Sequence, residues 1–375
     1  MTTEEYRQSL DTVIRLCACA ISGRKPESEL DPGKNTDLVY EAAEKHKLTA
    51  TVGMALESAG IKNGRFEQAV AMSQRKNALL DADRMKVLEA METAGVWYMP
   101  LKGSILKDMY PRYGMREMAD VDILFDEEHA EDMKVIMNKL GFVTKKYGLG
   151  VHDVYYKKPV SNFEMHRQLI NPILDERRER LNAYYTDVKT RLLKEEGNRF
   201  GYRFSDEDFY LFLTAHEYKH YIGKGTGIRS LLDTYVYLGK KQEGMDWDYI
   251  CRETEKMGIS EFEQTNRSLA LHVFNGEVLT KAEQDMLDCI LNAGTFGSTT
   301  KLIENEIRSK GRLGYSMAII RQAKHDAYGA YPVLKKLPVL YPILTAWFLI
   351  RPFAVNPKRS LKQLMIVLGI RKKEK

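Results

Sequence analysis

The spacing of the apolar residues changes at Val96, and no other feature of the sequence constrains the fold as strongly. Before that point apolar residues recur at helical intervals, as from Tyr6 to Ile21, and a long helix is predicted over about 66–95. From residue 205 onward the helical spacing returns. Between these regions, short apolar stretches alternate with turns at 96–99, 121–125, 142–146, 154–156 and 162–166, and helical segments lie near 104–109 and 127–140. The sequence therefore predicts an α+β fold, in which a small mixed sheet is flanked by helical N-terminal and C-terminal regions.

We divide the chain into four regions on this pattern. They are a helical N-terminal region (1–90), an α+β core (91–170), a mainly helical domain (171–330) and an apolar and basic C-terminal tail (331–375). Ser205-Asp206-Glu207-Asp208 resembles a capping box, which predicts that a helix containing His216 begins there.

The composition excludes several classes of protein. With 44% hydrophobic and 29% charged residues the chain is of the globular type, and a net charge of +5 is too small to indicate nucleic-acid binding. The four cysteines show neither a disulfide framework nor a CxxC pair for zinc. The polar, acidic N-terminal residues do not resemble a signal peptide. We therefore expect free thiols and a cytoplasmic location.

The longest uncharged apolar run lies near the C-terminus, at 337–350. It has 14 residues, whereas a membrane-spanning helix needs about 20, so no transmembrane segment is predicted. We expect this run to pack on the helical domain. A peripheral membrane or partner contact through 337–375 is the alternative, because basic residues follow the run.

Two aspartates lie at the start of a predicted strand, in Asp120-Val121-Asp122. Side chains alternate along a strand, so Asp120 and Asp122 project from the same side, roughly 7 Å apart at Cα. Two carboxylates at that separation suit Mg²⁺, which prefers oxygen ligands and keeps waters that phosphates can replace. Two such ions would stabilise the attacking and the leaving oxygen of a phosphoryl transfer.

A third acid and a basic loop add to this constellation. In the predicted strand 162–166, Glu164 and His166 face the same way, so Glu164 completes a three-carboxylate site if this strand pairs beside that of the aspartates. Lys102-Gly103-Ser104 follows a short strand and opens a helix, where backbone N–H groups favour phosphate and glycine permits close approach. Lys102 and Arg116 are predicted to neutralise the triphosphate or the departing pyrophosphate.

The order of these motifs resembles the nucleotidyltransferase superfamily of DNA polymerase β. Within it, the chain is most similar to the fifth of the NTP-transferase families, a group of uncharacterised bacterial nucleotidyltransferases. The resemblance covers about residues 40–355. It rests on Leu101-Lys102-Gly103, Tyr110-Pro111, Arg116, Asp120-Val121-Asp122, Glu164-Met165-His166, His216 to His220, Gly227-Ile228-Arg229, Asp233 and Tyr331 to Lys336.

This resemblance implies a Mg²⁺-dependent transferase that uses two ions, with Mn²⁺ as the alternative metal. It would move a nucleoside monophosphate from a triphosphate such as ATP to a hydroxyl or phosphate of an acceptor and release pyrophosphate. Asp120 and Asp122 would bind both ions, Glu164 would hold the catalytic ion and accept the acceptor's proton, and Gly103 and Ser104 would touch the phosphates. The chain departs from the superfamily in the 15 residues between Ser104 and Asp120.

Two questions stay open at this point. The acceptor is unidentified, and a small molecule, a sugar, a protein or an RNA would fit the same core. The other open question is activity, since a protein of this fold can also bind nucleotide without turnover.

A second motif competes with this interpretation. His216-Glu217-Tyr218-Lys219-His220 matches H-E-x-x-H, the signature of zinc metalloproteases, with both histidines on one helical face. No suitable third ligand stands out downstream, so a zinc protease is kept as an alternative function. In the other interpretations, His216 packs in the core, or Lys219, His220 and Arg229 lie beside the nucleotide or acceptor.

Overall fold

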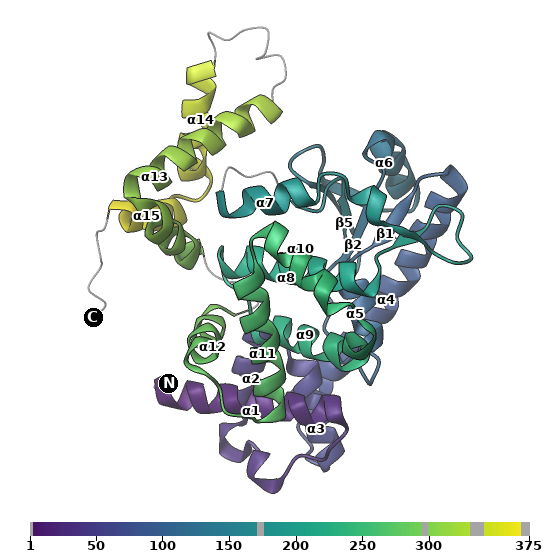
Figure 1. Cartoon of the computed structure of the whole chain (residues 1–375), viewed down its shortest axis with the longest axis vertical. Coiled ribbons are helices and arrows are strands. Elements are labelled where there is room, and N and C mark those ends of the chain that lie inside the picture. Colours follow the sequence, from purple (N-terminus) through teal and green to yellow (C-terminus); the bar gives the residue numbers. More distant parts are fainter. Residues whose placement is uncertain (1–2, 171–175, 295–298, 331–340, 369–375) are drawn as a thin grey trace.

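The computed structural model describes residues 3–170, 176–294, 299–330 and 341–368. Its architecture is α+β, as predicted, with a five-stranded mixed sheet among helices (Figure 1). The N-terminal helices come first, and Asn63 caps the long helix α4 by accepting hydrogen bonds from the N–H groups of Arg65 and Phe66. Gly95, with φ 74°, ends that helix near its predicted end. The elements are α1 (Thr3–Ser22), η1 (Ser28–Leu30), η2 (Gly33–Asn35), α2 (Thr36–His46), α3 (Thr49–Ala59) and α4 (Gly64–Ala94).

The sheet has the strand order β1-β2-β5-β4-β3. Strands β2 and β5 pair in parallel, and the other neighbours pair antiparallel. A strand lies at each of the five predicted stretches. The elements of this region are β1 (Tyr98–Pro100), α5 (Gly103–Leu106), η3 (Lys107–Met109), β2 (Val121–Phe125), η4 (Glu127–His129), α6 (Ala130–Lys139), β3 (Val143–Lys146), β4 (His152–Lys157) and β5 (Ser161–His166).

The two faces of the sheet have different partners. Val121 and Ile123 of β2 and Phe163 of β5 are buried in a core shared with α4 and α6. Leu124 belongs instead to a core with the residues of α8, α9 and α10. Because side chains alternate along a strand, Asp122 lies on the same side as Leu124, toward the helical region.

The helices after the sheet begin at α7. Ser205 is the N-cap of α8, as predicted, and its side chain accepts a hydrogen bond from the N–H of Asp208. Leu232 of α9 and Leu269 of α11 share a core with Leu16 of α1 and Val52 of α3, so the N-terminal helices pack against this region. The elements are α7 (Glu176–Tyr184), η5 (Val188–Arg191), β6 (Leu193–Lys194), β7 (Tyr202–Arg203), α8 (Asp206–Tyr221), α9 (Ile228–Lys241), η6 (Gln242–Gly244), α10 (Trp247–Met257), α11 (Ser260–Asn275) and α12 (Lys281–Ala293).

Three last helices pack chiefly against one another, in the yellow-green part of Figure 1. They are α13 (Thr299–Ala330), which Gly311 interrupts, α14 (Tyr341–Val355) and α15 (Pro357–Leu368). The matching block Tyr331 to Lys336 and residues 337–340 of the apolar run lie outside the described residues. In the described part of the chain, no helix combines the length and the apolar character that a membrane crossing requires.

Candidate active site

Asp122 and Glu164 are paired positions of neighbouring strands. The parallel register of β2 and β5 sets Asp122 beside Glu164, and both side chains project on the face opposite the core of α4 and α6. The sequence predicted which way each acid points. The structure adds that these two strands are neighbours, so the condition for a shared carboxylate site is met.

Asp122 is the buried centre of the site, with 7% of its surface exposed. Its Oδ1 accepts hydrogen bonds from Lys102 Nζ at 2.9 Å and from His166 Nε2 at 2.7 Å. Burial by itself would raise the pKa of Asp122, but the Lys102 ammonium and the bond from His166 hold this pKa well below its usual range. Asp122 is therefore ionised.

The negative charge of Asp122 affects the pKa values of Asp120 and Glu164. Burial, followed by the charges of Asp122 and Asp120, raises the pKa of Glu164 to about 7. Burial and the charge of Asp122 also raise the pKa of Asp120, against the opposing effect of Lys102 and Arg229. Repulsion between the carboxylates thus adds to burial in raising the pKa of Asp120 and of Glu164. A divalent cation bound among them would relieve this repulsion, so the donor set fits such an ion.

Two histidines lie beside Glu164, and the sequence pattern predicted a role for neither of them. Glu164 Oε2 lies 3.6 Å from His152 Nε2 and 3.7 Å from His166 Nε2. The ligand atoms of these three residues lie within 4.8 Å of one another, close enough to share a metal ion. Burial lowers the pKa of both imidazoles, that of His152 to about 4, so both are neutral at pH 7. The Nε2 of a neutral His166 that donates to Asp122 has no lone pair for a metal, so His166 could ligate through this nitrogen only if the ion replaced that hydrogen bond.

A sequence signal existed for only one of these histidines. His166 follows Glu164 by two residues, on the same face of β5. His152 lies directly opposite His166 across the β4–β5 pair, and that register cannot be read from one strand alone.

Gly103 opens α5 directly after Lys102, whose backbone φ is 41°. A Cβ at Gly103 would stand 2.7 Å from Arg116 Nη1 and 2.9 Å from Met118 Cε. A Cβ would therefore force these two side chains to shift, so packing within the chain favours glycine here, in addition to any approach of a phosphate. Ser104 is buried, and its Oγ has no hydrogen-bond partner among the described residues.

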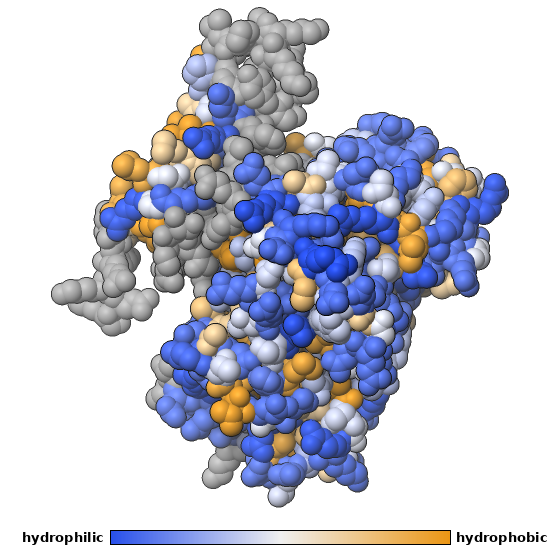
Figure 2. Space-filling view, in the orientation of Figure 1, coloured by the Kyte–Doolittle hydropathy of each residue, from blue (hydrophilic) through white to orange (hydrophobic). Residues whose placement is uncertain are grey.

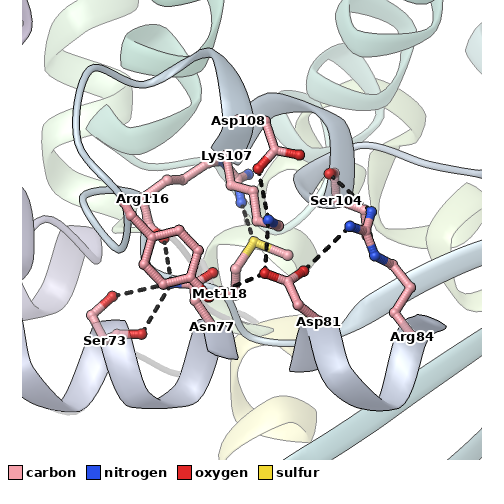
Figure 3. Close-up of polar contacts among 10 residues, drawn as sticks. Ser73, Asn77, Asp81, Arg84, Ser104, Lys107, Asp108, Arg116 and Met118 are labelled. Atoms are coloured by element: carbon pink, nitrogen blue, oxygen red, sulfur yellow. Dashed lines mark hydrogen bonds and ion pairs between the residues drawn. The ribbon is translucent and has the colours of Figure 1, made fainter. Parts of the chain in front are cut away.

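The inserted segment between Ser104 and Asp120 is held by a polar stripe on α4 (Figure 3). Four residues of this helix, spaced three or four apart, bond to the segment or to Ser104 directly before it. Ser73 Oγ donates to Gly114 O at 2.7 Å, Asn77 Nδ2 to Arg116 O at 3.2 Å and Arg84 Nη1 to Ser104 O at 3.3 Å, while Asp81 accepts from Lys107 Nζ at 3.0 Å. The insertion is thus fixed against the long helix.

Arg116 does not have the free guanidinium that the predicted phosphate contact needs. It is 7% exposed, and it binds Asp233 of α9 through two hydrogen bonds, Nε to Oδ1 at 2.7 Å and Nη2 to Oδ2 at 2.8 Å. Tyr110 OH also donates to Asp233, at 2.8 Å. The structure therefore gives Arg116 a positioning role, in which it joins the loop before β2 to the helical region.

The other predicted nucleotide-binding residues approach from the helices. His216 and His220 of α8 are 3.1 Å apart at their Nε2 atoms, and burial, followed by the charges of Lys102 and Lys219, holds the pKa of His216 well below its ordinary value. Arg229 of α9 donates to Glu117 O at 3.2 Å, and its charge opposes the rise in the pKa of Asp120. The end of α8 and the start of α9 therefore lie beside the carboxylates.

Glu217 is held in the core between α8, α9 and α11 by hydrogen bonds of its own. It is 3% exposed, and its carboxyl group accepts from Asn266 Nδ2 at 2.7 Å and from Thr234 Oγ1 at 3.2 Å. A zinc protease needs this glutamate beside the metal. In the described residues, the group that could hold a metal includes neither His216 nor His220. The geometry therefore gives no support to the zinc-protease alternative.

A family model described as an uncharacterised nucleotidyltransferase matches residues 32–275. The match includes the sheet, α4 and the helices up to α11. No curated protein and no solved structure matches the chain.

Proposed function

This chain belongs to the uncharacterised nucleotidyltransferase family, and we propose that it is a metal-dependent enzyme that transfers a nucleoside monophosphate from a nucleoside triphosphate to an acceptor. The observation that carries the proposal is the pairing of Asp122 with Glu164 on β2 and β5, with Asp120 close enough to raise the pKa of Glu164 and to have its own pKa raised by Asp122. Three acids on one face of a small sheet, open to a helical region, suit phosphoryl transfer.

Asp120, Asp122 and Glu164 are the residues that would hold Mg²⁺. When bound, the metal would neutralise charge on the phosphates and lower the pKa of the acceptor hydroxyl. The adjacent imidazoles of His152 and His166 favour a first-row transition ion over Mg²⁺ at one position, so Mn²⁺ is the second candidate.

The remaining groups bind the substrate. Lys102 Nζ already lies on Asp122 and can turn toward the triphosphate, while the N–H groups of Gly103 and Ser104 lie at the start of α5. Lys219, His220 and Arg229 approach from the helical side, which would leave the nucleotide between the sheet and α8. Glu164 Oε2 is the expected acceptor of the proton that the attacking hydroxyl loses.

The acceptor is the open part of this function, because carboxylates that handle phosphates do not select the second substrate. A small molecule, a sugar, a protein or an RNA end would each present a hydroxyl or phosphate. Incubating the protein with each labelled triphosphate and a cell extract, and following the label, identifies both the base and the acceptor class.

Pyrophosphate release tests the proposal. Asp122→Asn keeps the shape of the side chain and removes its charge, and we expect release to fall by at least about 100-fold. Asp132→Asn makes the same change on the exposed surface of α6 and should leave release within about twofold. Equal release by the two variants contradicts the proposal. Nucleotide binding without any release in the wild type assigns the chain to non-catalytic nucleotide-binding proteins.

A further inference from the structure

Each of the last three helices carries an exposed apolar stripe. The members of each stripe follow one another at intervals of three or four residues, so they share one face of their helix. Their exposed fractions run from 40% to 82%. Figure 2 shows orange, apolar residues gathered over this part of the molecule. The stripes are Leu313, Met317 and Ile320 on α13, Ile343, Trp347 and Ile350 on α14, and Leu361, Leu364 and Leu368 on α15.

The rest of the described chain offers these stripes no apolar counterpart. Large exposed hydrophobic residues before α13 are scattered over α4, α6, several loops and short strands. They do not form a stripe of their own. Those residues are Met72, Met85, Tyr113, Val135, Val143, Leu149, Leu193 and Val278.

The last three helices and the rest of the chain also differ in the sign of their net charge. Residues 299–375 contain sixteen Lys and Arg but four Asp and Glu, a net charge of +12, whereas residues 1–298 have a net charge of −7. A second copy of the same helices would meet like charge. An anionic lipid surface matches both the positive charge and the apolar stripes.

We propose that α13–α15 are a docking element for an anionic membrane surface. The stripes would enter the boundary between headgroups and acyl chains, where tryptophan side chains such as Trp347 are favoured. Arg312, Arg321 and Arg351, which are exposed on the same helices, would face the lipid phosphates. Contact of this kind is peripheral, in keeping with the lack of a membrane-spanning helix among the described residues.

Sedimentation of the full chain with vesicles tests this inference. Vesicles of phosphatidylcholine mixed with phosphatidylglycerol should carry down the wild type, and vesicles of phosphatidylcholine alone should not. Trp347→Ser with Ile350→Ser should lower the partition coefficient by at least about tenfold. Val278→Ser, a matched change at a residue that is 93% exposed between α11 and α12, should not change it.

Charge and insertion can be tested separately. Changing Arg312, Arg321 and Arg351 together to Gln should remove the preference for anionic vesicles, and added salt should do the same. In a Trp97→Phe, Trp247→Phe background, the emission of Trp347 should shift to shorter wavelength when anionic vesicles are added. The inference is overturned if the wild type binds no vesicles, or binds neutral ones equally well. It is also overturned if the stripe variants change only self-association, measured by light scattering.

Discussion

His166 Nε2 lies 2.7 Å from Asp122 Oδ1 and 3.7 Å from Glu164 Oε2, so one imidazole connects two of the proposed metal ligands. His152, opposite it on β4, approaches the same glutamate. Oxygen-only sites suit Mg²⁺, whereas an imidazole adds affinity for first-row transition ions. The site therefore combines the carboxylate oxygens of a Mg²⁺ site with the imidazole nitrogens of a site for a transition-metal ion.

We expect His152→Asn to change the choice of metal. The apparent affinity for Mn²⁺, measured by titrating the ion against pyrophosphate release, should fall by about tenfold, while that for Mg²⁺ changes by less than about threefold. His129→Asn at the exposed start of α6 is the control. Equal losses for both ions would mean that His152 does not ligate.

Asp233→Asn should unfold the protein more readily. It leaves the buried Arg116 guanidinium without its carboxylate, which costs about 3–5 kcal/mol of unfolding free energy in urea denaturation. Asp285→Asn, which breaks the exposed pair with Lys281, should cost less than about 1 kcal/mol. A small loss in Asp233→Asn would show that the pair does not hold α9 to the core.

Glu217 should make stability depend on pH. Burial raises its pKa in the folded state to about 8, whereas an unfolded glutamate titrates near about 4.3. Between these values the unfolded chain releases a proton that the folded chain keeps, so this group's contribution to the unfolding free energy falls as pH rises. Glu217→Gln has no such proton, so its stability relative to wild type should rise from pH 5 to pH 8. A difference that stays constant over this range would contradict the buried, protonated glutamate.

Much of the fold can be predicted from the sequence because the spacing of apolar residues and the helix caps depend on residues that are close together in the chain. The alternation in 120–125 and 162–166 gives the direction of Asp122 and Glu164 without any knowledge of the sheet. Their pairing is not local, since β5 inserts between β2 and β4. For the same reason, sequence reasoning missed His152 as a neighbour of Glu164.

Arg116 has a partner in the structure that the sequence near it does not reveal. An arginine before a carboxylate motif is a reasonable phosphate ligand, but its partner Asp233 lies 117 positions away on α9. The residues around Arg116 in the sequence do not show whether its guanidinium binds a phosphate or pairs with a buried carboxylate. The motif H-E-x-x-H misleads similarly, because spacing fixes the histidines on one face while tertiary packing decides that Glu217 faces Asn266.

Direct binding of Mn²⁺, followed by its electron paramagnetic resonance in the presence of a non-hydrolysable nucleoside triphosphate, tests the central claim. Nucleotide alone sets the background. The wild type should bind the ion beyond this background, Glu164→Gln should bind it at least about tenfold more weakly, and Asp122→Asn should return to background. Wild-type affinity in both variants would show that these carboxylates do not hold the metal, and the proposed mechanism would fail.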